Sequence, residues 1–163
     1  MKKNILLIIT ASIAAYKTLE LIRIMNNSFY NVTCVLTEKA EYFITKPSLS
    51  AISGNFVYQS MIDSESTTTH HPHIELSRNN DLIVVAPATA DFMAKIALGL
   101  ADDLASSIIL GSNKKIILAP AMNVEMWEKN VTKRNLKTLE NDGVIIVEPG
   151  KGELSCGENG IGR

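Results

Sequence analysis

Asn123 is the residue whose position in this sequence most directly suggests chemistry. It follows a short apolar run, 115–119, which predicts a strand buried on both faces and is ended by Pro120. A helix is expected to begin at Asn123, so Met126 and Trp127 would share a face with it and could wall a pocket. An uncharged amide beside the free N–H groups of a helix start can bind a carboxylate or a carbonyl oxygen. The alternative is an ordinary asparagine helix cap above a methionine and tryptophan core stripe.

Two further side chains could transfer protons. His73 lies in the string HIEL, and histidine exchanges protons readily near neutral pH, although a histidine at a helix start is otherwise a cap or a surface residue. Cys156 lies in residues 149–163, which hold five of the nine glycines, so we predict a flexible loop there rather than a packed element. A cysteine exposed in such a loop seldom serves packing. The other cysteine, Cys34, lies in the strand-like run VTCVLT and is predicted to be a small buried hydrophobe.

Composition excludes several classes of function. The chain has 163 residues, which suits one compact domain. Sixteen basic and 17 acidic residues leave a formal charge of −1, and no basic patch is interleaved with aromatic residues, so neither nucleic acid nor membrane is indicated as a partner. No metal is expected, because the two cysteines lack ligand spacing and the pair His70 and His71, which we expect to be loop residues, has no supporting ligand cluster. The apolar N-terminal run is too short for a membrane span and fits a first strand and helix, so we expect a cytoplasmic protein.

Short β-branched runs alternate with longer helical patterns, which is typical of a parallel sheet covered by helices on both faces. The predicted strands are 4–10, 31–37, 81–86, 115–119 and 144–148, with a weaker one at 56–59. The predicted helices are 12–27, 38–44, 47–53, 73–79, 90–111 and 123–142, of which the last two are expected to be interrupted. We therefore predict a single Rossmann-like or flavodoxin-like three-layer α/β domain over residues 1–163, with ligands bound beyond the carboxyl ends of the strands.

Other loops at that edge also carry polar residues. The loop 10–17 has no GxGxxG fingerprint, but small residues and the Ser12 hydroxyl at a helix start can bind a phosphate. A serine there is also an ordinary helix cap. Thr37 and Lys39 follow the second strand and are candidate polar contacts, or part of a solvated cap. Thr89 follows the apolar strand LIVVA and offers another hydroxyl.

Three strings at these places resemble the motifs of the flavin-dependent cysteine decarboxylases. This family holds the phosphopantothenoylcysteine decarboxylases and the peptidyl-cysteine decarboxylases of lantibiotic maturation. PAMNVEMW at 120–127 resembles the family signature PxMNxxMW, and HIEL at 73–76 resembles its HIEL motif. LSCGENGIGR at 154–163 resembles the LACGExGxGR flap of the phosphopantothenoylcysteine decarboxylases, which the peptidyl-cysteine decarboxylases generally lack.

The resemblance implies that FMN binds at the strand ends. Where the family shows TGSIAAYK or TGGIAAYK, this chain has TASIAAYK, so Ala11 stands in place of a glycine. The family's phosphate motif PASANT is PATADF here, with Asp91 and Phe92 in place of Asn and Thr. A carboxylate beside a phosphate is unfavourable, so we expect Asp91 to contribute backbone contacts or to cap its helix. The implied cofactor contacts are Ala11, Ser12, Ile13, Thr37, Lys39, Thr89, Ala90, Asp91, Phe92 and Ala121.

The resemblance also implies a reaction and the roles of the residues in it. In that reaction oxidised FMN would take two electrons from the cysteine CH2–SH group and so give a thioaldehyde. The thioaldehyde would accept the electrons released when the carboxylate leaves as CO2. Asn123 would bind that carboxylate through a neutral amide. A cationic side chain would instead form a salt bridge, and the salt bridge would stabilise the ground state more than the transition state. His73 would assist substrate positioning and proton movement, and Cys156 would supply a proton after the flap closes. The remaining implied substrate contacts are Met126, Glu153 and Ser155.

We therefore expect an FMN-dependent phosphopantothenoylcysteine decarboxylase of coenzyme A biosynthesis, with 149–163 as its flexible substrate-binding flap. Relatives form trimers, sometimes assembled into dodecamers, with FMN and substrate between subunits, and in many bacteria a phosphopantothenoylcysteine ligase is fused downstream. A homo-oligomer and a ligase partner are therefore implied. The alternatives are a peptidyl-cysteine decarboxylase, a flavin prenyltransferase, which the complete PxMNxxMW string disfavours, and a non-catalytic FMN-binding regulatory protein. The joint presence of His73, Asn123 and Cys156 argues against the last of these.

Overall fold

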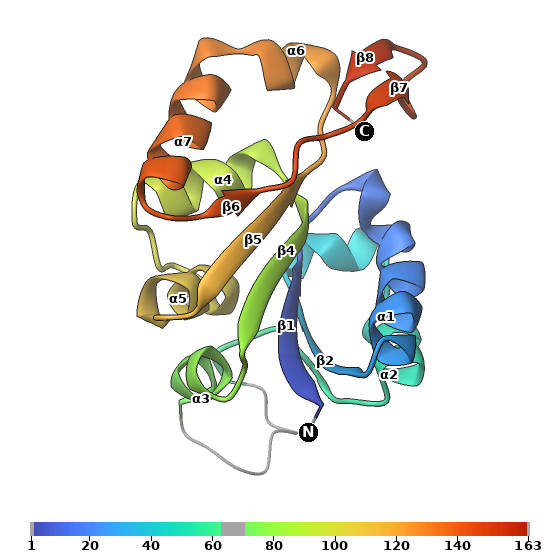
Figure 1. Ribbon diagram of the computed structural model, residues 1–163. Coiled ribbons are helices and arrows are strands. Elements are labelled where there is room, and N and C mark those ends of the chain that lie inside the picture. Colours follow the sequence, from blue (N-terminus) through green and yellow to red (C-terminus); the bar gives the residue numbers. More distant parts are fainter. Residues whose placement is uncertain (1, 63–70, 163) are drawn as a thin grey trace.

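The central sheet is parallel and has six strands in the order β3-β2-β1-β4-β5-β6 (Figure 1). The computed structural model describes residues 2–62 and 71–162, so His70 and Arg163 lie outside the described residues. The strands are β1 (Lys3–Ile9), β2 (Tyr30–Leu36), β3 (Val57–Tyr58), β4 (Leu82–Ala88), β5 (Lys115–Pro120) and β6 (Ile145–Ile146). All the predicted strands are confirmed, with small shifts at their ends.

The helices also follow the predicted pattern. They are the 3₁₀ helices η1 (Ile13–Lys17) and η2 (Glu38–Tyr42), and the α-helices α1 (Thr18–Asn27), α2 (Lys46–Ser53), α3 (Pro72–Arg78), α4 (Ala90–Ala97), α5 (Leu104–Gly111), α6 (Val124–Glu128) and α7 (Asn130–Asn141). The two long helical predictions are interrupted as expected. Gly99 follows α4 with a φ of 68°, which ends that helix, and Lys129 separates α6 from α7 with an extended backbone.

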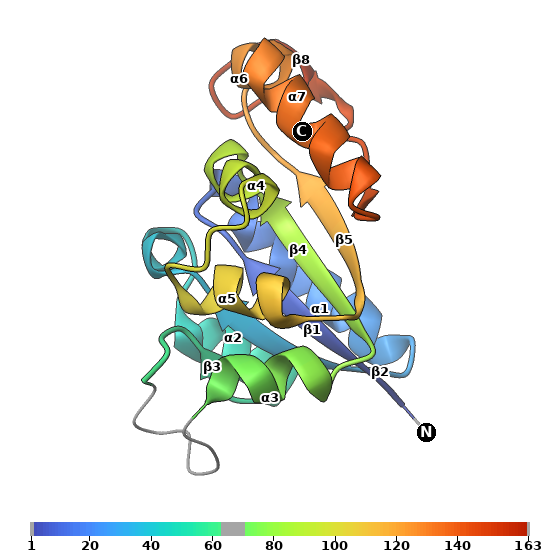
Figure 2. The same cartoon turned by 90° about the vertical axis from the view of Figure 1, so that its left-hand side faces the viewer.

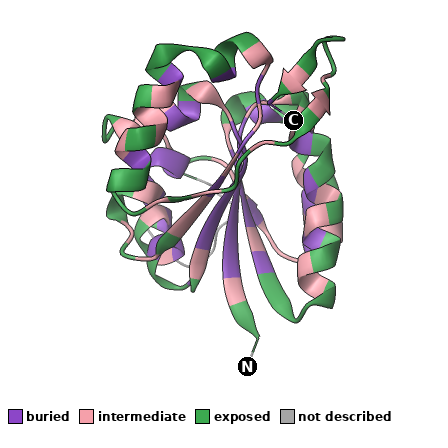
Figure 3. Ribbon diagram, turned by 45° about the horizontal axis from the view of Figure 1, so that its top comes forward, coloured by how far each residue is buried: buried purple, intermediate pink, exposed green. Residues whose placement is uncertain are grey.

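Helices cover both faces of the sheet (Figures 1 and 2). α1 and α2 lie on one face, and α3, α4, α5 and α7 lie on the other. Because successive strand side chains point to opposite faces, Leu6 and Ile8 of β1 pack beneath the second group of helices, whereas Ile5, Leu7 and Ile9 pack beneath the first. Figure 3 shows buried residues concentrated on the central strands and exposed residues on the outer faces of the helices.

The order of the strands reverses between β1 and β4, which is where a doubly wound sheet leaves a crevice at its carboxyl edge. This is the Rossmann order, and the predicted three-layer α/β fold is confirmed. Thr10 connects the loop after β1 to the end of β4 through hydrogen bonds. Its buried hydroxyl donates to the carbonyl oxygen of Pro87 at 2.6 Å and accepts the N–H of Thr89 at 3.1 Å.

The C-terminal segment contains a hairpin, so the prediction of a loop rather than a packed element is corrected. β7 (Lys151–Glu153) and β8 (Asn159–Ile161) pair in antiparallel fashion. Just after β8, the carbonyl oxygen of Gly162 accepts the N–H of Met122 at 3.0 Å. Gly162 has a φ of 151°, and a Cβ there would collide with the backbone oxygen of Met122, so only glycine allows this approach. The hairpin is thus fixed to the loop that carries Asn123.

None of the helices within residues 2–62 and 71–162 combines the length and the apolar character needed to cross a membrane. The same residues contain no group of three or more histidine, cysteine, aspartate or glutamate side chains arranged to hold a metal ion.

Candidate functional site

Two clefts open at the carboxyl edge of the sheet and share the residues Ala11 and Thr89. The first cleft has a volume of about 560 Å³ and the second a volume of about 750 Å³, both in the usual range for small-molecule sites. Ala11 follows β1 and Thr89 follows β4, so the shared wall lies where the strand order reverses. The crevice expected of a doubly wound sheet is present.

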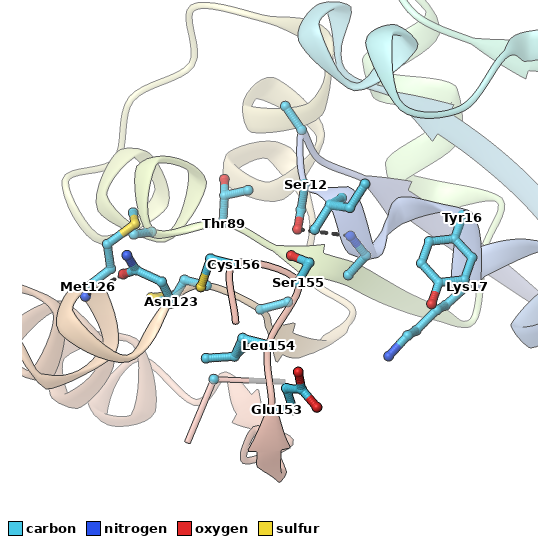
Figure 4. Close-up of a pocket in the computed structure, with 17 residues that line it drawn as sticks. Ser12, Tyr16, Lys17, Thr89, Asn123, Met126, Glu153, Leu154, Ser155 and Cys156 are labelled. Atoms are coloured by element: carbon cyan, nitrogen blue, oxygen red, sulfur yellow. Dashed lines mark hydrogen bonds between the residues drawn. The ribbon is translucent and has the colours of Figure 1, made fainter. Parts of the chain in front are cut away.

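Most of the residues predicted for the site line these clefts. Of the predicted cofactor contacts, the first cleft has Ala11, Ser12, Ile13, Thr89, Ala90 and Ala121. The second has Ala11, Thr37, Lys39, Thr89, Asp91 and Phe92. The predicted substrate and proton-transfer residues Asn123, Met126, Glu153, Ser155 and Cys156 all line the first cleft (Figure 4). The hairpin therefore contributes to the same cleft as the loop after β5.

A polar residue stands at the N-cap of the helix that follows each strand bordering the clefts. These residues are Ser12 after β1, Thr37 after β2, Thr89 after β4 and Asn123 after β5. The hydroxyl oxygens of Ser12 and Thr89 each accept a backbone N–H of their own helix at 3.2 Å. Because the caps use the oxygens as acceptors, the hydroxyl hydrogens remain available as donors to a ligand. Capping and ligand binding are compatible at these positions.

Asn123 combines the two interpretations that its sequence position allows. Its Oδ1 accepts the N–H of Met126 at 2.8 Å, which caps α6. That bond identifies the oxygen of the amide and leaves Nδ2, with two hydrogens, as the free donor. In Figure 4, Asn123, Met126 and Cys156 lie on the same side of the first cleft. The amide can therefore donate to a carboxylate near a thiol.

The prediction that Trp127 walls the pocket is wrong. Trp127 is buried with 5% of its surface exposed, it belongs to the hydrophobic core, and the ammonium of Lys133 lies 4.4 Å from its ring centroid. Met126 is 45% exposed and lines the cleft instead. Consecutive helical residues point about 100° apart, and in α6 this separation turns Met126 toward the cleft and Trp127 toward the core. Met122, which the motif also contains, supplies the buried part of the wall.

His73 does not line either cleft of its own chain. It is half-buried in the first turn of α3, and its ring centroid lies 6.1 Å from that of His71. Its Nδ1 is buried and has no hydrogen-bond partner in the described part of the chain. Figures 1 and 2 show α3 toward the opposite end of the molecule from α6 and the hairpin. One chain thus brings together Asn123 and Cys156, but not His73.

Asp91 does not cap its helix, since Thr89 takes that position. The Asp91 side chain is exposed in the first turn of α4 and lines the second cleft. The other expectation, that Asp91 contacts the cofactor through its backbone, stays a prediction. A carboxylate in a first helical turn is electrostatically favourable. The departure from the family motif is therefore compatible with the local fold.

A charged network that the sequence did not reveal borders the second cleft. The ammonium of Lys95 lies 2.9 Å from Oδ1 of Asp102 and 3.2 Å from Oδ2 of Asp103. The hydrogen bond to Asp102 raises the pKa of Lys95, and the same bond lowers the pKa of Asp102. These contacts tie the end of α4 to the loop before α5, where Asp103 and Ser106 form a capping box. The seven residues of sequence separation between Lys95 and Asp102 did not predict that their side chains would form an ion pair.

Several lining residues were missed by reasoning from the sequence. Tyr16 and Lys17 line the first cleft from the end of η1, and Gly162 lines it from the hairpin. Thr10 lines the second cleft and joins the β1 and β4 loops. A hydroxyl ending an otherwise apolar strand was an available signal for Thr10. Lys17 had a weaker signal, because a lysine after two alanines and a tyrosine also reads as a solvated helix residue.

Comparison with known proteins agrees with this geometry. The Flavoprotein family model matches residues 1–163. The coenzyme A biosynthesis bifunctional protein CoaBC of Haemophilus influenzae is 45% identical over 161 residues, which are 99% of this chain and 40% of that protein. The chain thus spans about 40% of the length of the curated relatives it matches.

Two solved structures extend the comparison. A mutant PPC decarboxylase in complex with pantothenoylaminoethenethiol is 32% identical with a TM-score of 0.87, over 99% of this chain and 90% of that one. The FMN binding protein AtHal3 is 34% identical with a TM-score of 0.84, over 99% and 89%. The family resemblance carried by the three motifs is confirmed. The chain belongs to the Flavoprotein family.

Proposed function

We propose that this chain is an FMN-dependent decarboxylase that converts 4'-phosphopantothenoylcysteine to 4'-phosphopantetheine in coenzyme A biosynthesis. The observation that carries the proposal is the presence of the Asn123 amide and the Cys156 thiol in one cleft. The first comes from the loop after β5 and the second from the C-terminal hairpin. The names of the CoaBC relative and of the PPC decarboxylase structure support the same reaction.

The residues at the junction of the clefts suit FMN. Ser12, Thr37 and Thr89 each offer a hydroxyl, and Ala11 and Ala90 allow a ligand to approach the backbone. The first turn of α4 adds N–H groups without intrahelical acceptors, which favour a phosphate. FMN would also contact Ile13, Lys39, Asp91, Phe92 and Ala121. When bound, FMN supplies the acceptor, and later the donor, of the two electrons exchanged with the substrate CH2–SH group.

The chain's own residues hold the substrate and provide a proton. Nδ2 of Asn123 donates to the cysteine carboxylate, and a neutral donor holds this group without stabilising it as strongly as a cation would. Met122 and Met126 surround the carboxylate with apolar surface, which weakens its solvation and favours its loss as CO2. The thiol of Cys156, which lines the same cleft, protonates the product carbon.

We further propose that a second copy of the chain supplies His73. The support is that His73 lies outside both clefts of its own chain and that its buried Nδ1 has no hydrogen-bond partner among the residues that the structure describes. A trimer, alone or assembled into a dodecamer, is the arrangement that the resembled family leads us to expect. A phosphopantothenoylcysteine ligase, in the same polypeptide or in another, would supply the substrate in the cytoplasm.

Product analysis tests the function. Purified protein containing FMN is incubated with phosphopantothenoylcysteine and, separately, with a peptide ending in cysteine, and CO2 and products are followed by mass spectrometry. We expect phosphopantetheine from the first reaction and unchanged peptide in the second. No turnover of the first substrate by FMN-loaded protein would refute the proposal, and turnover of the peptide alone would identify a peptidyl-cysteine decarboxylase.

A further inference from the structure

Lys17 lies in the first cleft, away from the residues proposed to hold the cysteine end of the substrate. Figure 4 draws Asn123 and Cys156 at one side of the cleft and Lys17 at the other. Among the described residues that line this cleft, Lys17 is the one cation and Glu153 the one anion. Neither the carboxylate site nor the proposed cofactor contacts make use of the lysine.

The backbone that carries Lys17 is fixed, whereas its side chain is free. Lys17 ends η1, and the next residue, Thr18, is buried and donates its hydroxyl to the carbonyl oxygen of Ala15 at 2.6 Å. Ala15 is itself fully buried in the core. The Lys17 side chain is exposed and forms no ion pair within residues 2–62 and 71–162. Its charge is therefore available to a ligand in the cleft.

We propose that Lys17 binds the phosphate group of the substrate and selects phosphorylated over unphosphorylated pantothenoylcysteine. This inference rests on the proposed function, whose substrate carries a carboxylate at one end and a phosphate at the other. A substrate bound by its carboxylate at Asn123 directs its phosphate toward the other side of the cleft. The phosphate carries a charge of about −1.5 to −2 near neutral pH, and a lysine ammonium is a compact point charge suited to it.

Glu153 carries the opposite charge to Lys17, so it should affect the binding of a phosphate in the opposite way. Its carboxylate lines the same cleft from β7 and repels a phosphate bound by Lys17. Glu153→Gln therefore strengthens the preference for a phosphorylated ligand, whereas Lys17→Gln weakens it. A lysine with a purely structural role changes the binding of phosphorylated and unphosphorylated ligands equally, so the ratio of the two affinities isolates the phosphate contact.

Calorimetric titration of FMN-loaded protein with 4'-phosphopantetheine and with pantetheine measures this ratio. We expect Lys17→Gln to reduce it by about threefold to tenfold, through weaker binding of the phosphorylated ligand alone, and Lys17→Arg to restore most of it. The effect of Lys17→Gln is expected to shrink at high salt. Lys137→Gln removes the same charge from an exposed position on α7 and leaves the ratio unchanged.

An unchanged ratio in Lys17→Gln, or an equal weakening of both ligands, overturns the assignment. In turnover, Lys17→Gln raises the KM for phosphopantothenoylcysteine, keeps its kcat, and leaves the reaction of pantothenoylcysteine unaltered. If the wild type shows a Lys17-dependent preference for phosphopantetheine but decarboxylates neither substrate, the proposed function fails while the Lys17 assignment stands. If it decarboxylates both substrates with a preference that does not depend on Lys17, the assignment fails while the function stands.

Discussion

Asn123 illustrates why a helix-capping residue can also bind a ligand. The cap uses only Oδ1, which accepts the N–H of Met126, and this bond holds the amide with Nδ2 free to donate. Sequence reasoning identified the residue, the helix start and the methionine three residues on. It could not separate Met126 from Trp127, because the rotation of a five-residue helix relative to the core depends on contacts from distant segments.

Cys156 and Cys34 differ in environment, and this difference predicts different roles. Cys156 is exposed and lines the first cleft. Cys34 is buried, as its strand position predicted, and burial raises the pKa of its thiol to about 12, with a hydrogen bond to Ser53 acting in the opposite direction. Of the two thiols, only Cys156 lies in a cleft, which is where the proposed proton donor must be.

Replacing the proton donor should interrupt the reaction after CO2 is lost. We expect Cys156→Ser to release CO2 but to accumulate a decarboxylated product that lacks two hydrogens relative to phosphopantetheine, because a serine hydroxyl is a far weaker acid than a thiol. Mass spectrometry of the quenched reaction distinguishes the two products. Cys34→Ala serves as the control and should form phosphopantetheine; phosphopantetheine as the main product of Cys156→Ser would remove Cys156 from the mechanism.

At the scale of elements, the parallel strands end at one edge of the sheet, and the loops that follow them carry most of the residues of the two clefts. Alternation of apolar runs predicted every strand of this sheet, and the polar residues after the strands predicted where the clefts lie. The hairpin was not predicted because its glycines suggested flexibility, whereas Gly160 and Gly162 serve close packing. A Cβ at Gly160 would lie 2.6 Å from Cγ2 of Val124, on the helix that Asn123 caps.

The close approach at Gly162 should couple the hairpin to the carboxylate site. We expect Gly162→Ala to displace the hairpin, since its Cβ collides with the backbone oxygen of Met122, and to lower kcat/KM by about tenfold through strain of the order of 1–3 kcal/mol. FMN absorbance should be retained. Gly111→Ala, which meets no atom within 4 Å, is the matched control; equal activity of the two variants would show that hairpin docking is not needed.

The Lys95–Asp102 pair gives the loop before α5 a stability that depends on pH. Because the pKa of Lys95 is raised, the part of the free energy of unfolding that depends on its charge is lost only in strongly alkaline solution. Because the pKa of Asp102 is lowered, the part that depends on its carboxylate is lost as the pH falls below the ordinary range of a carboxyl group. Lys95→Met should therefore lower the urea midpoint of unfolding near neutral pH, with a smaller difference from wild type at about pH 3. An equal difference at both pH values would contradict this role.

At the scale of the whole molecule, one chain does not complete the site that its sequence predicted. HIEL identified His73 as a candidate acid–base residue, but sequence spacing cannot tell whether two residues meet within one chain or between copies. The position of α3 relative to the clefts depends on how the whole sheet is covered. A site shared between copies reconciles the motif with this position.

Mixed oligomers test the shared site. His73→Asn and Asn123→Asp should each be inactive alone, but oligomers assembled from equal amounts of both should recover about a quarter of wild-type activity, because that fraction of sites draws both intact residues from different copies. The activity measured is phosphopantetheine formation. Asn123→Asp mixed with Cys156→Ser is the control in which phosphopantetheine formation does not recover, since those two residues line one cleft of one chain. Absence of recovery in the first mixture would indicate that His73 acts within its own chain or not at all.

The most direct measurement follows CO2 from phosphopantothenoylcysteine that carries a heavy isotope in its cysteine carboxyl group. The wild type should release one labelled CO2 for each phosphopantetheine formed. Asn123→Asp should keep its fold and its FMN, because aspartate caps a helix as well as asparagine does, yet it should release almost no labelled CO2, since its carboxylate repels that of the substrate. Labelled CO2 released by Asn123→Asp at the wild-type rate would contradict the role of the amide, and none released by the wild type would contradict the reaction itself.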